Sequence, residues 1–183
     1  MGLPVWYCVG ILIKFSKTFA LFSHLEIDFS LGIVFTYLGL SFGDLLSSLL
    51  SQYFKSRRKT IFIYLWVTII VSSVYLFVHP ISLNFFYFLC FALGTATGYW
   101  ALFVSMSAEL FGTNIRATVA STTPNFVRGA VVPMILSFKA MEPHIGSIHA
   151  ALILGIITLG LALASAWYLN ESFGKDLDFL EKD

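Results

Sequence analysis

Residues 60–78 read TIFIYLWVTIIVSSVYLFV, a run of nineteen positions without a charged side chain. A helix rises about 1.5 Å per residue, so this run nearly matches the ~30 Å hydrocarbon core of a bilayer. The whole chain shares this bias, because 58% of its 183 residues are apolar and 11% are charged. Soluble domains carry about 25% charged residues. The composition therefore indicates an integral membrane protein and excludes a water-soluble globule.

Six segments are long and apolar enough to cross a bilayer. They cover about residues 3–22, 29–53, 60–79, 81–107, 117–138 and 148–169. These runs are too continuous for membrane β-strands, which need about ten residues of alternating polarity. Helices are the other way to satisfy backbone polar groups in lipid. We therefore expect an all-α bundle of six transmembrane helices over residues 1–169, followed by a charged tail over 170–183.

The basic residues predict the orientation of this bundle. Seven fall in the tail and in the loops on the same side as the termini: Lys55, Arg57, Arg58, Lys59, Arg116, Lys175 and Lys182. The opposite loops hold two, Lys17 and Lys139. Cytoplasmic loops are enriched in Lys and Arg, so we expect both termini in the cytoplasm and the chain in a plasma or bacterial inner membrane. The net charge of +1 gives no electrostatic argument for a nucleic-acid partner.

Charged residues are distributed unequally among the six segments. The third and sixth contain none, whereas the first, second and fifth each contain at least one. A charge inside the membrane must face the bundle interior or a water-filled cavity. We therefore expect the first, second and fifth segments to line a cavity, and the third and sixth to face lipid. The repetition after every three segments suggests two related three-helix units.

Asp44 and Arg128 are the best candidates for a buried functional site. The helical rise places Asp44 about 16 Å from Lys55 and Arg128 about 18 Å from Arg116, so both are expected near the midplane. Each lies in a polar stripe at helical spacing. We expect a shared water-filled path in which Asp44 binds a proton or a polar group of the solute. Arg128 is expected to bind an anionic group or to tune Asp44. The alternative is that these residues form a structural ion pair, or polar contacts that hold the helices together.

Five further residues are assigned to the same pathway. Tyr37 and Asn125 belong to the stripes of the second and fifth segments. Lys14 is expected at a similar depth if the first helix extends to about residue 23. Tyr99 and Trp100 could stack on the solute, although packing in the core is the alternative for both.

Other patterns concern packing and chemistry. Gly39 with Gly43, and Gly94 with Gly98, form GxxxG pairs that allow close contact between helices. Pro124 is expected to interrupt and kink the fifth segment. The histidines show no metal-ligand spacing, and no cofactor motif is present. The paired catalytic groups of an intramembrane enzyme are also missing, so we expect no enzymatic activity.

Residues 108–117, AELFGTNIRA, resemble the loop between the tenth and eleventh helices of the major facilitator superfamily. Sugar-porter-like members carry there a glutamate, an aromatic residue and, seven residues after the glutamate, an arginine. Glu109, Phe111 and Arg116 match these positions, and Gly112 replaces the usual proline.

Two further segments resemble the same family in the same order. Residues 170–177, NESFGKDL, are similar to the signature after helix twelve, with Glu171 and Gly174 matching and Asn170 in place of proline. The basic loop at 55–59, KSRRK, lies where the family has an Asp-Arg-x-Gly-Arg-Arg element, without its Asp and Gly.

The resemblance implies that the chain corresponds to helices seven to twelve of a twelve-helix transporter. It also implies an ion-pair latch at the cytoplasmic end, with orientation-setting charge and helix capping as alternatives. The latch residues would be Arg57, Arg58, Glu109, Arg116 and Glu171.

The expected function is that of the C-terminal half of a secondary transporter, from a truncated or split chain. It would move a small organic solute (a sugar, polyol or organic acid) by alternating access against an N-terminal six-helix half, and a co-transported proton is one option. A membrane fragment without transport activity, or one that acts as an interaction partner, is the alternative.

Overall fold

The computed structural model describes residues 1–19, 27–78, 82–174 and 178, and every regular element in this part of the chain is helical. Four helices among the described residues are long and apolar enough to cross a membrane. They are α2 (Phe29–Phe54), α3 (Arg57–Phe77), the pair α4 (Leu83–Thr97) and α5 (Trp100–Glu109), which together cover Leu83–Glu109, and α8 (Ser147–Tyr168). These four coincide with the second, third, fourth and sixth segments expected from the sequence.

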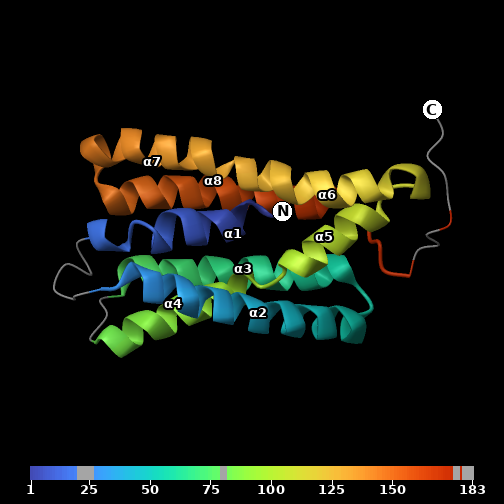
Figure 1. Ribbon diagram of the computed structural model, residues 1–183, viewed down its shortest axis with the longest axis horizontal. Coiled ribbons are helices and arrows are strands. Elements are labelled where there is room, and N and C mark those ends of the chain that lie inside the picture. Colours follow the sequence, from blue (N-terminus) through green and yellow to red (C-terminus); the bar gives the residue numbers. More distant parts are fainter. Residues whose placement is uncertain (20–26, 79–81, 175–177, 179–183) are drawn as a thin grey trace.

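The first segment is shorter than expected. Helix α1 (Leu3–Tyr7) continues as a π-helical stretch to Ile13, and a 3-10 turn follows at Ser16–Thr18. The prediction of an unbroken helix is therefore wrong over residues 14–19, and residues 20–22 lie outside the described part. The N-terminus lies about halfway along the bundle (Figure 1), so this helix covers only part of the bundle length.

The fifth segment is longer than expected and breaks at a different place. Helix α6 (Thr113–Gly129) passes through Pro124 without ending, and α7 (Val131–Ile145) follows after Ala130. The prediction that Pro124 interrupts the helix is wrong. Instead, the break lies just ahead of Pro133, whose missing N–H and fixed φ suit the first turn of α7. The loop expected from Lys139 onward is helical as far as Ile145.

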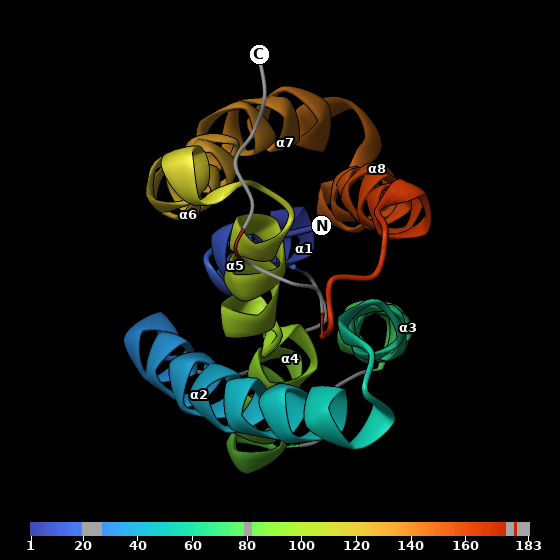
Figure 2. The same cartoon turned by 90° about the vertical axis from the view of Figure 1, so that its right-hand side faces the viewer.

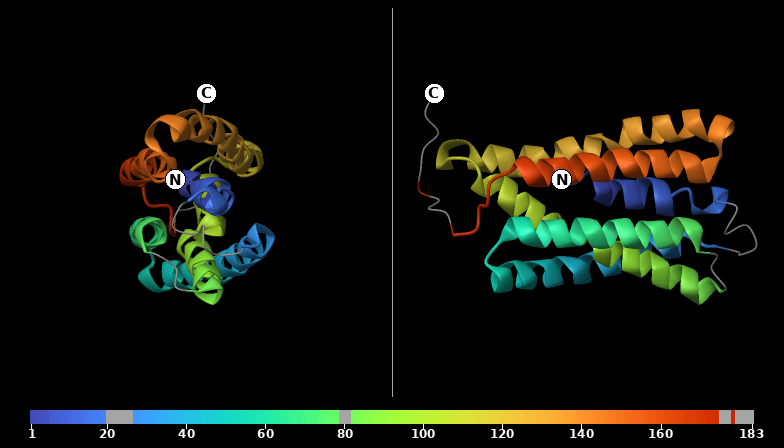
Figure 3. Two further views of the ribbon diagram at one scale, coloured as in Figure 1. Left: turned by 90° about the vertical axis from the view of Figure 1, so that its left-hand side faces the viewer. Right: turned by 180° about the vertical axis from the view of Figure 1, so that it is seen from behind.

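The helices surround α1 and α5, which occupy the middle of the bundle. Viewed along the bundle, α3 and α8 lie together on one side, α6 lies on the opposite side, and α2 runs obliquely across α4 (Figure 2). The view from behind shows α1 between α8 and α3 (Figure 3). One end of the bundle, the Arg57 end, holds the connections α2–α3 and α5–α6. At the other end the Ser147 hydroxyl donates to the Thr18 carbonyl at 3.1 Å.

Buried hydroxyl groups cross between the helices. Each donates to a main-chain carbonyl on another element, at 2.8–3.0 Å: Tyr7 to Ala151, Tyr64 to Gly43, Thr68 to Ala96 and Tyr75 to Leu12. These bonds tie α1 to α8, and α3 to α2, to α4 and to the π-helical stretch. In an apolar environment a hydroxyl without a hydrogen-bond partner is costly. A shift of one helix along another would break these bonds, so they also fix the register between the helices.

The two GxxxG pairs meet where α2 crosses α4. A Cβ on Gly94 would overlap the Thr36 carbonyl oxygen, and one on Gly39 would overlap the Phe91 carbonyl oxygen. At Gly98 a Cβ would overlap the Cα of Gly43. All three contacts are with backbone atoms, which cannot rotate aside. The glycines therefore allow the two backbones to touch, as small residues do in membrane proteins.

Gly94→Ala should weaken the contact between α2 and α4, because the added methyl group must push two backbones apart. We expect a loss of about 1–3 kcal/mol in the free energy of unfolding, the usual cost of overpacking, measured by SDS titration in mixed micelles. Gly160→Ala on α8 is the matched control, since nothing lies within 4 Å of the place that a Cβ would occupy there. Equal stability of the two variants would contradict the close contact.

Candidate functional site

Asp44 lies where the fourth apolar segment breaks into α4 and α5. Gly98 and Tyr99 interrupt this segment opposite Gly43, and the break leaves the first N–H groups of α5 without helical partners. One carboxylate oxygen of Asp44 accepts the Ala101 N–H at 3.0 Å. The half-buried side chain therefore caps α5 from α2, in the middle of the bundle.

Arg128 lies on α6, on the other side of α1. Its side chain is exposed, and its guanidinium carbon lies 5.4 Å from the centre of the Trp6 ring, within the range of a cation–π contact. The Trp6 ring meets Trp100 edge-on at 6.0 Å. Trp100 directly precedes Ala101, whose N–H is accepted by Asp44. The side chains of Asp44, Trp100, Trp6 and Arg128 therefore form a continuous row, and they come in this order from α2, α5, α1 and α6. We call it the Asp44–Arg128 row.

The two charges of the row are separated by the two indole rings. Among the described residues the structure holds one ion pair, between Arg57 and Glu109, and it is not part of this row. The alternative of a direct structural ion pair between Asp44 and Arg128 therefore does not hold in this conformation. The indole nitrogen of Trp6 is buried and has no hydrogen-bond partner. A carboxylate, an unpaired indole N–H and a guanidinium thus lie along one row.

Trp6 is a member of the row that the sequence pattern did not indicate. Tryptophan is usually enriched at the membrane–water interface, whereas Trp6 on α1 lies beside Arg128 of α6. In the sequence Trp6 lies three residues after the start of the first apolar segment, where a tryptophan is expected at the membrane–water interface, so its spacing gives no signal of a site.

Tyr37 and Asn125 lie on the helices that carry the two charges. Tyr37 is two turns before Asp44 on α2 and is 46% exposed. Asn125 is exposed on α6, one turn before Arg128, and its amide donates to the Ser121 carbonyl at 2.9 Å. Both side chains therefore extend the polar surface of the row along their own helices.

Tyr99 and Lys14 do not join the row. Tyr99 is fully buried, packs edge-on against Tyr64, and donates to the Met1 carbonyl at 3.0 Å, so it belongs to the core. Lys14 follows the π-helical stretch at the end of the bundle that holds Ser147, where its ammonium lies 6.0 Å from the Phe15 ring. The condition on which its expected depth depended is not met, because the first helix ends at Ile13 rather than near residue 23.

A second polar cluster lies at the Arg57 end. Arg57 donates from two nitrogens to both carboxylate oxygens of Glu109, with a distance of 2.6 Å from Nε to Oε2. The Ser172 hydroxyl donates to the same carboxylate at 2.7 Å. This fork-like geometry is the strongest form of an arginine–carboxylate contact, and it joins α3, α5 and the segment after α8.

Glu171 forms the other half of this cluster. Its carboxylate accepts the Ser56 hydroxyl and the N–H groups of Arg57 and Arg58 at the start of α3, the first N–H at 2.9 Å. It also accepts N–H groups from its own segment, including that of Phe173 at 3.0 Å. We call the group of Ser56, Arg57, Glu109, Glu171 and Ser172 the inner cluster.

Two more of the residues assigned to the latch are held nearby in other ways. Arg58 lies against the rings of Phe62 and Trp167 and donates to the Trp167 carbonyl at 2.6 Å, which ties α3 to α8. Arg116, on the first turns of α6, donates from Nε to the Phe111 carbonyl at 3.2 Å. The structure thus brings Arg57, Glu109 and Glu171 together, with Arg58 beside them.

The inner cluster changes the acidity of Glu171. Partial burial on its own raises the pKa of this carboxyl, but hydrogen bonds from the Ser56 hydroxyl and from three backbone N–H groups outweigh it. The pKa of Glu171 therefore lies below its ordinary value of 4.5. A carboxyl whose pKa is depressed by folding stabilises the fold above its ordinary pKa, and this stabilisation is lost as the pH falls through the folded value.

No protein-family model, curated protein or solved structure matches the chain. Within the described ranges, no group of three or more His, Cys, Asp or Glu side chains could hold a metal ion. The candidate site is therefore characterised by its own geometry.

Glu171→Gln should lower stability at neutral pH and have a smaller effect in acid. Between pH 7 and pH 3 the wild type should lose stability as Glu171 becomes protonated, whereas the variant has no carboxyl to protonate there. The difference in thermal unfolding temperature between the two proteins in detergent should therefore shrink below pH 4.5. Glu142→Gln, on α7 at the opposite end, is the charge-matched control. A difference that stays constant to pH 3 would contradict the role of Glu171.

Proposed function

We propose that the chain is one six-helix half of a secondary transporter that moves a small organic solute across a membrane by alternating access. In this proposal α1 and the pair α6–α7 belong to the membrane domain beside the four long apolar helices, and both termini lie in the cytoplasm of a cell-membrane protein. The bundle would bind its solute against an N-terminal six-helix half.

The observation that carries this proposal is the polarity of α6. None of its seventeen residues is buried, and threonine, serine, asparagine and arginine side chains make up about half of it. Such a surface is costly in contact with lipid, where polar side chains have no partners. Yet α6 packs beside α5, α1 and α7 within the bundle. A water-filled cavity, or another protein surface across that cavity, is the environment in which this helix is stable.

The position of α6 supports the proposal that a water-filled cavity lies on one side of the bundle. Helix α8 and the part of α3 beyond Lys59, which carry no Asp, Glu, Lys or Arg, lie together on the opposite side (Figure 2), where exposed apolar side chains such as Ile70 and Ile156 suit lipid. The Asp44–Arg128 row runs from α6 towards α2 across the middle. This arrangement supports the proposal that the segments with charged residues line a path and those without them face lipid.

The row provides groups of both signs for a solute. Arg128 can bind a carboxylate or another anionic group, and its cation–π contact with Trp6 orients it without neutralising its charge. Asp44 can accept a proton or a hydroxyl group of the solute. Protonation of Asp44 removes the negative charge next to the first N–H groups of α5. Proton binding at Asp44 is therefore coupled to the stability of the first turn of α5.

The inner cluster is a candidate for the latch that the resemblance to the major facilitator superfamily implies. It joins the ends of α5 and α8 to the start of α3 through hydrogen bonds that can form in one conformation and break in another. Single exposed ion pairs contribute little, but a network present in only one conformer biases the equilibrium between two.

The water-filled cavity can be tested by thiol labelling in membranes. Thr122→Cys on α6 should react with a membrane-impermeant maleimide at least about tenfold faster than Ile156→Cys on α8, because α6 faces water and Ile156 faces lipid. Both positions are exposed and lie well inside their helices, and the native Cys8 and Cys90 are buried. Equal labelling rates at the two positions would contradict the presence of a water-filled cavity beside α6.

The site assignment is tested by uptake through the chain co-expressed with an N-terminal six-helix half, with labelled sugars, polyols and carboxylates as probes. Asp44→Asn keeps an acceptor for the Ala101 N–H but loses the charge, so it should reduce uptake at least about tenfold while α5 stays capped. Arg128→Ala should reduce uptake of carboxylates most. Ile156→Ala is the control on the lipid side. Normal uptake by both site variants would remove the assignment.

A further inference from the structure

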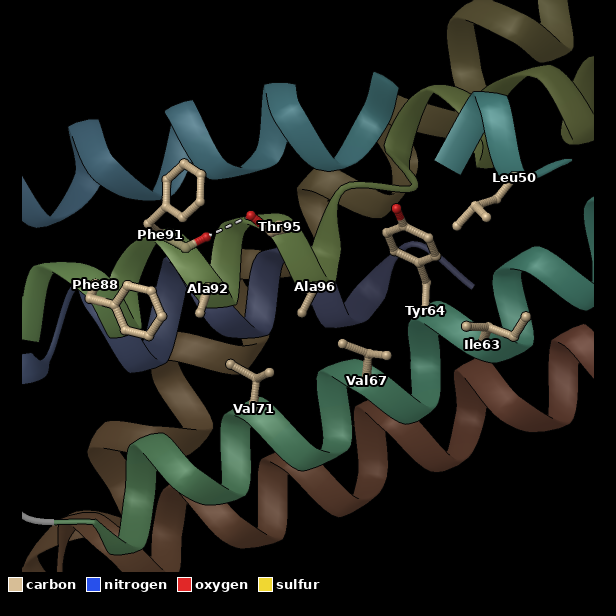
Figure 4. Close-up of a pocket in the computed structure, with 10 residues that line it drawn as sticks. All are labelled: Leu50, Ile63, Tyr64, Val67, Val71, Phe88, Phe91, Ala92, Thr95 and Ala96. Carbon is tan, nitrogen blue, oxygen red and sulfur yellow. Dashed lines mark hydrogen bonds between the residues drawn. The ribbon is translucent and has the colours of Figure 1, made fainter. Parts of the chain in front are cut away.

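An apolar groove of about 410 Å³ lies between α3 and α4. Figure 4 shows Ile63, Val67 and Val71 of α3 on one wall and Phe88 and Ala92 of α4 on the other. From Ile63 to Val71 the groove extends about 12 Å along the helix axis. On this side of the protein the neighbouring side chain of Ile70 is 61% exposed. The groove therefore opens in the part of the bundle that suits lipid.

The groove offers no unpaired hydrogen-bonding group among its lining side chains. The Thr95 hydroxyl donates to the Phe91 carbonyl at 3.0 Å, as the dashed line in Figure 4 shows. The Tyr64 hydroxyl, at one end of the groove, donates to the Gly43 carbonyl at 3.0 Å. The remaining lining is aliphatic or aromatic. An alkyl chain is the ligand that such a surface accommodates without leaving a polar group unpaired.

Two lysines lie just beyond the Arg57 end of this groove. Lys59 precedes Ile63 by one helical turn on the same face of α3, and Lys55 follows α2 in the corner between α2 and α3, with a φ of 49°. Both are exposed. Together with Arg58 they line a second hollow of about 520 Å³, whose other walls include Phe54, Phe62 and Glu171.

The two lysines differ from the two arginines at this corner, because the arginine side chains are already held by other groups. Arg57 is paired with Glu109, and Arg58 is held against α8. Glu171, the acidic residue of the second hollow, is occupied by hydrogen bonds from Ser56 and the start of α3. In the described part of the chain neither Lys55 nor Lys59 forms an ion pair. Each basic residue near a membrane surface contributes about 1 kcal/mol to attraction for an anionic lipid.

We propose that an anionic phospholipid binds at this corner, with its headgroup phosphate between Lys55 and Lys59 and one acyl chain in the groove between α3 and α4. The charge lies at the membrane surface, and the apolar groove starts one turn deeper in the bilayer. This order of charge and apolar surface matches the order of headgroup and chain in a phospholipid. The inference requires the chain to lie in a bilayer and does not depend on transport.

The test is native mass spectrometry of the full chain in detergent, with dioleoylphosphatidylglycerol and dioleoylphosphatidylcholine as probes. The wild type should retain the anionic lipid at least about tenfold better, as expected for two lysines. Lys55→Gln with Lys59→Gln should reduce this preference to about onefold. Lys17→Gln with Lys139→Gln, near the opposite end, is the control of equal charge and should keep it.

Two further arms separate the groove from the charges. Ala92→Phe fills the groove and should reduce retention of both lipids severalfold. Inorganic phosphate should displace the anionic lipid poorly, because it has no acyl chain. The proposal is overturned by equal retention of the two lipids in the wild type, or by equal losses in the two lysine pairs. It is also overturned by unchanged binding in Ala92→Phe, or by ready displacement by phosphate.

Discussion

The contact between the backbones of α2 and α4 is the constraint on which the rest of the structure depends. Because Gly43 and Gly98 touch, the fourth apolar segment breaks opposite Asp44 and brings the first N–H groups of α5 within reach of its carboxylate. A larger side chain at either glycine would move this break away from Asp44. The candidate site is therefore a consequence of helix packing as much as of its charged residues.

The all-helical architecture and its four long apolar helices could be predicted from the sequence, because length and hydropathy together decide whether a segment can cross a bilayer. The prediction was wrong for segments in which length and hydropathy do not decide where a helix begins and ends. Helix α6 carries Arg116, Asn125 and Arg128, and its limits depend on packing and on Pro133 rather than on hydropathy. The first helix ends at Ile13, just before the polar stretch 14–18, although the segment expected from hydropathy extends to residue 22.

The candidate site was only partly visible in the sequence. Helical spacing predicted a similar depth for Asp44 and Arg128, but spacing along one helix does not show which residues of two other helices lie between them. Trp6 and the N–H of Ala101 became visible only in three dimensions. Conversely, stacking on the solute was one expectation for Tyr99, but this residue lies in the break between α4 and α5 and its side chain enters the core.

Helix α5 has a consequence of its own, because it connects the two polar regions of the molecule. It starts at the N–H groups capped by Asp44 and ends at Glu109, which holds Arg57. Ten residues of helix form a stiff rod of about 15 Å. A tilt of this rod at its capped start would move the Glu109 carboxylate at its other end, so a change at Asp44 would be transmitted to the contact between Glu109 and Arg57.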